Sequence, residues 1–170
     1  MDDLMEYNYA ENLDRIKSWI NNCDTKISFA LTFEIFLLGF IFSNDTIQKV
    51  VEIKKEVNVQ TIVLLLSFLT ALILLSLSLV TFYKALKANV NPDSESSVLY
   101  YGSISSQTFN SFRKDVNGLT EYKLKQDYIA QIHTTAKICK KKFDNYNKGL
   151  KFLFISFIPL VIYFSISIFI

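Results

Sequence analysis

The chain has 170 residues, of which 51% are hydrophobic and 20% charged, with a formal net charge of +2. This length predicts a single domain, and a mean hydropathy of +0.26 is high for a water-soluble one. One histidine and two distant cysteines give no metal-ligand spacing, and no glycine-rich phosphate loop or nucleophile elbow is present. We therefore expect neither a metal or cofactor nor an enzymatic activity.

Residues 1–26 are predicted to form a cytoplasmic segment whose main element is an amphipathic helix from Tyr9 to about Asn22. Its apolar positions recur at alternating spacings of three and four residues, the pattern of a helix that packs one face against a partner. The stripe continues without changing face into the next segment and consists of Leu13, Ile16, Ile20, Cys23, Ile27, Ala30 and Glu34. We expect its cysteine to be a small core residue rather than half of a disulfide.

Three apolar runs are predicted to cross a membrane as helices: residues 27–42, 61–83 and 150–170. About 20 apolar residues span the hydrocarbon core of a bilayer, and the second run contains no charged residue. The third contains Pro159, which membrane helices tolerate, and the first is short and carries Glu34. The expected fold is all-α: one integral membrane helical bundle over residues 1–170, with three transmembrane helices and cytoplasmic helical extensions.

Glu34 is an ionisable residue inside the first apolar run. A charge in a membrane is costly unless it faces protein or water, so such a residue is a candidate functional site. One interpretation is a protonated side chain hydrogen-bonded to a hydroxyl of another span, for which Ser67, Thr70, Ser76 and Ser78 are available. The other is a pore-lining carboxylate in an oligomer.

The charges predict how the chain is oriented in the membrane. Residues 84–149 contain eleven Lys and Arg against six Asp and Glu, whereas residues 1–26 contain three against six and residues 43–60 three against three. Basic loops remain on the cytoplasmic side. We therefore expect a cytoplasmic segment at 84–149, an external hairpin at 43–60 and a cytoplasmic N-terminus.

Turns are predicted to divide the cytoplasmic segment. Asn91–Ser94 and Asn117–Gly118 have the composition of turns, and the aromatic stretch Val98–Ile104 between them has an extended character. Either Ser105 or Ser106 is expected to cap the short helix that follows.

One long helix is predicted from residue 121 to residue 170, with Thr120 as its cap. Its first part is charged, and it becomes apolar after Lys151. A second stripe with alternating spacings of three and four follows this helix: Ile129, Ile132, Ala136, Cys139, Phe143, Tyr146 and Leu150. Two helices that each carry one continuous stripe are expected to pack along each other.

Cationic and aromatic side chains occur together in the cytoplasmic segment: Arg113, Lys114, Lys137 and Lys140–Lys142 with Tyr100, Tyr101, Phe109 and Phe112. Aromatic faces stack on a base and cations neutralise a phosphate, so a nucleotide site is one interpretation. The alternative is that the lysines lie near anionic lipid headgroups and enforce the topology. We expect no DNA or RNA partner.

Three stretches carry a family resemblance: NLDRIKSWINNCDTKISFALTF, YYGSIS and KQDYIAQIHTTAKICKKKFDNYNKGLKFLFI. Together they resemble the transmembrane effector family of the Pycsar bacterial antiphage systems, over nearly the full chain. In that family an N-terminal helix ends in an Asp-x-Lys step, which Asp24 and Lys26 match, and an aromatic–glycine element follows the second span, which Tyr101–Ile104 matches. A Gln-Ile helix with lysines further on is matched by Gln131, Ile132, His133, Lys137, Lys141 and Lys142.

The resemblance implies a membrane effector of abortive infection in the bacterial inner membrane, assembled as a homo-oligomer. A cognate cyclase would make the activating ligand, a cyclic pyrimidine mononucleotide (cCMP or cUMP), and the membrane would then lose integrity. The ligand-binding residues it implies are Tyr100, Tyr101, Ser103, Arg113, Gln131, His133, Lys137 and Lys141.

Two other functions stay open from the sequence. One is a toxin-like or structural membrane protein that a protein partner controls through residues 84–149. The other is a small channel subunit in which Glu34 is the ion site.

Overall fold

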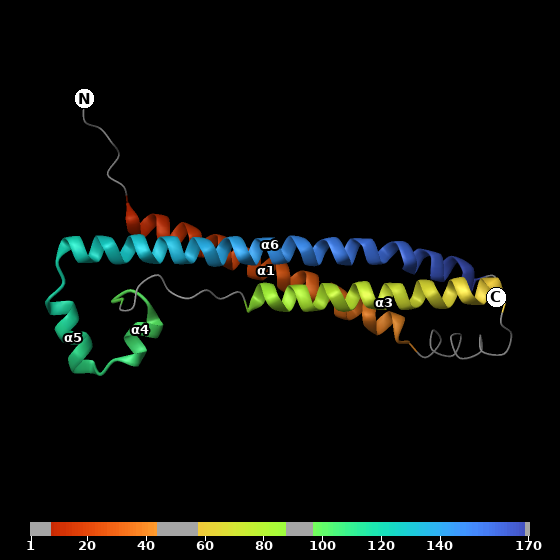
Figure 1. Cartoon of the computed structure of the whole chain (residues 1–170), viewed down its shortest axis with the longest axis horizontal. Coiled ribbons are helices and arrows are strands. Elements are labelled where there is room, and N and C mark those ends of the chain that lie inside the picture. The colour runs from red at the N-terminus through yellow and green to blue at the C-terminus, as the bar shows by residue number, and fades with distance from the viewer. Residues whose placement is uncertain (1–7, 44–57, 88–96, 169–170) are drawn as a thin grey trace, which may run out of the picture. The chain divides into compact units, whose positions relative to one another are not determined.

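The computed structural model describes residues 8–43, 58–87 and 97–168, and all regular structure within these ranges is helical (Figure 1). This confirms the predicted all-α class. The helices are α1 (Tyr9–Ile41), α3 (Val59–Leu86), α4 (Tyr101–Ser106), α5 (Phe109–Asn117) and α6 (Glu121–Ser167). The predicted external hairpin, at 43–60, and the predicted turn at 91–94 lie largely or wholly outside the described residues.

The chain divides into two compact units. Unit 1 comprises Met1–Asn22 and Ala88–Lys142, and unit 2 comprises Cys23–Lys87 and Phe143–Ile170. The long helices α1 and α6 contribute residues to both units, whereas α3 belongs to unit 2 and α4 and α5 belong to unit 1.

Unit 2 is built from α3 and the adjoining parts of α1 and α6, which share one apolar core. The predicted stripe of α1 enters this core: Cys23 and Ile27 are fully buried, and so is Glu34. The core residues that α3 contributes follow a helical spacing and include Ala71, Leu75, Phe82 and Ala85. This confirms that the stripe of α1 packs against other helices.

Two described helices, α3 and α6, are long and apolar enough to cross a membrane. Helix α3 contains the predicted span 61–83, and α6 contains residues 150–167 of the predicted span 150–170 and continues through Pro159. The third predicted span, 27–42, is not confirmed by the same measure, since α1 also carries charged residues.

The outer surface of unit 2 is apolar, α1 included. Phe29, Phe36 and Val161 expose between 62% and 75% of their surface. Exposing so much apolar surface to water is unfavourable. An apolar patch of this kind marks a membrane or protein interface. Together with the two apolar helices, it points to unit 2 as the part of the chain suited to a membrane.

Local side-chain chemistry sets the ends of the unit 1 helices. The Thr120 hydroxyl accepts a hydrogen bond of 3.3 Å from the backbone N–H of Lys123, so the predicted cap of α6 is confirmed. Helix α5 ends at Asn117, with Gly118 as its C-cap, as the predicted turn requires.

Two predictions for the segment before α5 are wrong. The stretch predicted to be extended contains α4, which begins at Tyr101, and the serines predicted to cap α5 lie inside α4. The cap of α5 is Thr108, whose hydroxyl accepts from the backbone N–H of Ser111. The Ser105 hydroxyl instead donates to the carbonyl of Gly102, within its own helix.

The predicted stripe of α6 is only partly correct within unit 1. Cys139 is buried, but Ile129 exposes 42% of its surface. The buried positions around them include the polar residues Gln131, Thr134 and Lys142. The face of α6 that unit 1 covers is therefore more polar than the apolar spacing predicted.

Candidate functional site

Ser97 organises the start of the described cytoplasmic segment. Its hydroxyl accepts hydrogen bonds from the backbone N–H groups of Leu99 (3.1 Å) and Tyr100 (3.0 Å). It also accepts one of 3.1 Å from the side-chain amide of Gln131 on α6. Ser97 is 4% exposed and Gln131 8% exposed, so this network joins the segment before α4 to α6 away from water.

Asp127 fixes the same segment one turn earlier on α6. Its Oδ2 atom accepts a hydrogen bond of 2.9 Å from the backbone N–H of Val98. Asp127 and Gln131 are four residues apart, so they occupy the same face of the helix. Together they hold Ser97 and Val98 against α6.

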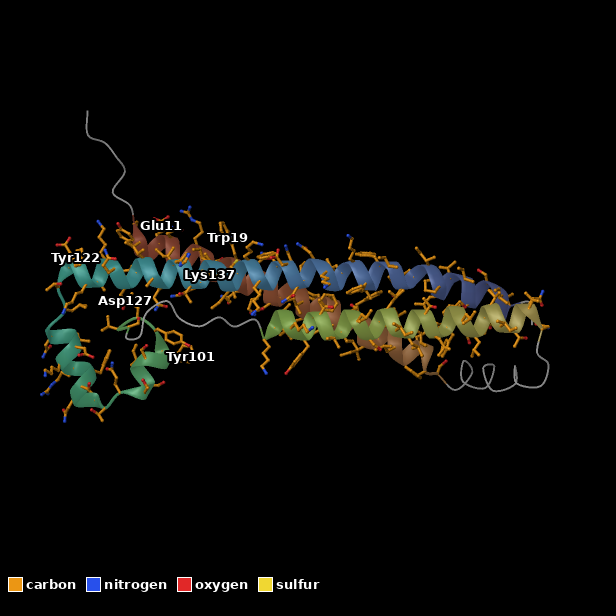
Figure 2. All side chains as sticks on the ribbon, viewed as in Figure 1. Glu11, Trp19, Tyr101, Tyr122, Asp127 and Lys137 are labelled. Carbon is orange, nitrogen blue, oxygen red and sulfur yellow. The ribbon has the colours of Figure 1, made fainter. Side chains whose placement is uncertain are left out.

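A cavity of about 500 Å³ lies beside this contact, within unit 1. Pockets of about 300–1,000 Å³ are the usual size for small ligands and cofactors. The cavity is lined by Ser97, Val98, Gln107, Lys114, Asp115, Gly118, Leu119, Tyr122, Lys123, Gln126 and Asp127. In Figure 2, Tyr122 and Asp127 lie on the first turns of α6.

Two acceptor atoms at this cavity are buried without a hydrogen-bond partner: Oδ1 of Asp127 and Oε1 of Gln107. Buried polar atoms are almost always hydrogen-bonded in folded proteins, so such a pair needs an explanation. Both residues line the cavity. A ligand that carries hydrogen-bond donors would satisfy both atoms.

The charged side chains that line the cavity are balanced. Lys114 on α5 and Lys123 on α6 are cationic, and Asp115 and Asp127 are anionic. The ammonium groups are partners for a phosphate, and the ring of Tyr122 is an aromatic face for a base. The cavity therefore combines the features that a nucleotide requires.

The two tyrosines predicted to bind a ligand contact each other. The rings of Tyr100 and Tyr101 are 4.9 Å apart, and Tyr101 is 77% exposed. A hydrogen bond to the Tyr101 side chain, and secondarily its charge, raise the pKa of Tyr100. A Cβ at Gly102 would collide with the Tyr100 ring, so this position of the ring requires glycine at residue 102. Neither tyrosine is among the lining residues of the cavity.

The other predicted binding residues are dispersed over unit 1. Gln131 belongs to the Ser97 network, and Arg113 is exposed on α5, next to the cavity-lining Lys114. His133 lines a separate shallow groove with Tyr9, Ile129, Ile132 and Ala136. Ser103 lies in α4, and Lys137 and Lys141 are exposed on α6. Their role in ligand binding stays a prediction.

None of the eleven residues that line the cavity belongs to the set predicted to bind a ligand, and those with polar or aromatic side chains include Ser97, Gln107, Tyr122, Lys123 and Asp127. Lys114 belongs to the cationic set on which the nucleotide-site interpretation rests, but not to the residues that the family resemblance implies for ligand binding. A single polar residue in a connecting segment is not part of a periodic pattern, so its role cannot be predicted from spacing. The one available hint is the spacing of Lys123, Asp127 and Gln131, which are four residues apart along one helix face.

Within unit 2, Glu34 is hydrogen-bonded to Ser78, one of the four hydroxyl residues expected as possible partners. The Ser78 hydroxyl lies 3.1 Å from Oε2 of Glu34 and 3.1 Å from the carbonyl oxygen of Gly149. All three are buried, and they come from α1, α3 and α6. The geometry therefore places Glu34 inside the packing of the three helices.

The predicted junction pair lies where α1 enters unit 2. Asp24 is half-buried and Lys26 is exposed. The carbonyl of Asp24 accepts a hydrogen bond of 2.9 Å from the Ser28 hydroxyl. No group of three or more His, Cys, Asp and Glu side chains in the described ranges is arranged to hold a metal ion.

Taken together, the two apolar helices and the apolar surface of unit 2 point to an α-helical membrane protein whose other unit contains a cavity. Residues 8–169 match the family model of the Pycsar effector protein domain, PycTM. The chain belongs to this family, which confirms the predicted resemblance and the class of antiphage defence effectors.

One curated relative supports the same assignment. The chain is 34% identical to the Pycsar effector protein GmPycTM of Gulbenkiania mobilis. The alignment is 172 positions long and covers 90% of this chain and 88% of the relative. No solved structure matches the chain.

Proposed function

We propose that this effector senses a cyclic pyrimidine mononucleotide in the cavity of unit 1 and, when it is bound, impairs the integrity of the bacterial inner membrane. The observation that carries the proposal is the cavity itself. It has nucleotide size and brings together two lysines, an aromatic ring and two unpartnered acceptors. The family membership supports the class of ligand, since the matched model describes a Pycsar effector.

The proposed ligand would act through the contacts between the residues that flank α4, helix α5 and helix α6. The cavity is lined by residues that precede α4, by α5 and by the first turns of α6. A ligand that touches all three stabilises the arrangement in which they approach, and it shifts the conformational equilibrium only by its differential affinity for that arrangement. Because α6 also supplies residues to unit 2, a rearrangement of its first turns has a covalent route into the membrane unit.

In this proposal the membrane-embedded part is multi-pass, with the N-terminus and unit 1 in the cytoplasm. The excess of basic residues in 84–149 supports that orientation. The apolar faces of α1 supply the third membrane-inserted helix beside α3 and α6. Copies of the chain would assemble into a homo-oligomer, and a cognate cyclase would supply the nucleotide.

Dye release from liposomes tests the proposal directly. The purified full chain is reconstituted at several densities, and cCMP, cUMP, cAMP or cGMP is added. Leakage is expected with at least one pyrimidine nucleotide and not with the purine nucleotides. Lys114→Ala and Lys123→Ala are each expected to raise at least tenfold the nucleotide concentration that is needed for leakage. The matched control is Lys125→Ala, which lies on α6 but outside the cavity lining. Absence of leakage with every nucleotide at every density would contradict the proposal.

A further inference from the structure

Two of the side chains that line the cavity of unit 1 each have a buried acceptor atom without a partner. Oδ2 of Asp127 is used by the backbone N–H of Val98, at 2.9 Å, which fixes the orientation of the carboxylate. Its Oδ1 atom is buried and has no partner, and the same holds for Oε1 of Gln107. Both side chains line the cavity.

A carboxylate has acceptors and no donor. The amino group on C4 of cytosine carries two N–H donors, and an Asp or Glu side chain that accepts from this group is an established means of reading cytosine. Uracil has a carbonyl oxygen at the same position. That oxygen would face the Asp127 carboxylate with no proton between them, at the cost of leaving a buried polar pair unsatisfied.

The number of donors and acceptors also agrees. An amino group presents two hydrogen atoms, and two of the residues that line the cavity each have one buried oxygen atom that lacks a donor. The ammonium groups of Lys114 and Lys123 are separate cations at the same cavity and are available for the phosphate. The base and the phosphate therefore have distinct partners.

Resting on the proposed function, we infer that this cavity selects cCMP over cUMP, and that Asp127 and Gln107 are the residues that determine this specificity. Asp127 is the stronger discriminator because its side chain cannot supply a donor, whereas an amide such as that of Gln107 can turn its NH₂ group toward a carbonyl.

Calorimetric titration of the full chain in lipid nanodiscs with cCMP and with cUMP tests the inference. The wild-type chain is expected to bind cCMP at least tenfold more tightly. Asp127→Asn keeps an oxygen for the Val98 N–H and gains an NH₂ donor for the uracil carbonyl, so the preference is expected to vanish or reverse. Glu121→Gln removes one negative charge from the first turn of α6, outside the cavity lining, and is expected to keep the wild-type preference.

A second variant separates the reading of the base from the folding of the cavity. Gln107→Leu removes one acceptor and is expected to weaken cCMP binding severalfold while cUMP binding changes little. Equal or tighter binding of cUMP by the wild-type chain, or an unchanged preference in Asp127→Asn, overturns the inference and leaves the proposed function standing. Binding of neither nucleotide by the wild-type chain overturns the proposed function, and the inference with it.

Discussion

The side-chain amide of Gln131 donates a 3.1 Å hydrogen bond to the Ser97 hydroxyl, across 34 residues of sequence. The same hydroxyl accepts from the N–H groups of Leu99 and Tyr100. One buried oxygen atom therefore serves three donors, and it positions the segment that forms one wall of the nucleotide-sized cavity.

Ser97→Ala is expected to destabilise unit 1 by about 1–3 kcal/mol, because it leaves buried donors without an acceptor. Ligand binding should weaken in parallel, since Ser97 and Val98 line the cavity. Hydrogen exchange of the Leu99 and Tyr100 amides measures the effect. Ser106→Ala is the control, because that hydroxyl is exposed and donates only to the carbonyl of Ser103. Equal exchange in the two variants would contradict the role of Ser97.

The sequence predicted where α6 begins but not which side of it unit 1 covers, and the reason is physical. A cap is local: the Thr120 hydroxyl meets an N–H three residues along the chain. The buried face is a tertiary property. Gln131 is buried because Ser97 supplies its partner, while the apolar Ile129 remains 42% exposed. A prediction from apolar spacing alone buries Ile129 and leaves Gln131 exposed, which is the opposite of what the structure shows.

The candidate site could not be predicted from sequence patterns either. Asp127 and Gln107 lie twenty residues apart, and neither belongs to a recognised motif. They become a pair only because α5 and the turn after it bring both side chains to one cavity. The apolar character of α3 and α6, in contrast, follows from composition alone, and both helices are long and apolar enough to cross a membrane.

Glu34→Gln tests whether the buried carboxylate is structural. The amide of glutamine keeps an oxygen that can accept from Ser78, which lies 3.1 Å from Oε2 of Glu34. The variant is therefore expected to assemble and to release dye as the wild type does, with unchanged selectivity in bilayer conductance recordings. Glu11→Gln, at an exposed position paired with Arg15, is the control. A change of ion selectivity confined to Glu34→Gln would favour the channel-subunit alternative.

The thiol of Cys139 is expected to react slowly. Burial raises its pKa, and the residue is 7% exposed. A raised pKa lowers the thiolate fraction at a given pH, and the thiolate is the nucleophile. Labelling by a maleimide should therefore be at least tenfold slower in the folded chain than in the denatured chain, and it should accelerate as the pH rises toward the raised pKa.

The labelling experiment uses a Cys23→Ala background, so that Cys139 is the remaining thiol. Ser105→Cys, exposed on α4 in the same unit, is the reactive comparison. Neither Cys23 nor Cys139 forms a disulfide in the structure, so reducing agent should not change the result. Rapid labelling of Cys139 at neutral pH would contradict its burial.

Gly149→Ala is expected to disturb the packing of α6 against α3. A Cβ at Gly149 would lie 2.7 Å from ring atoms of Phe82, and the Phe82 ring is fully buried. Extra volume in a packed core typically costs about 1–3 kcal/mol. Gly39→Ala is the matched control in the same unit, because nothing lies within 4 Å of a Cβ there.

Unfolding of both variants in detergent gives the comparison, and Phe82→Leu combined with Gly149→Ala completes a double-mutant cycle. The leucine side chain is smaller than the ring, so the cost of Gly149→Ala should fall in its presence and the two substitutions should not be additive. Equal stability of Gly149→Ala and Gly39→Ala, or strict additivity in the cycle, would show that α3 and α6 do not approach as closely as the structure places them.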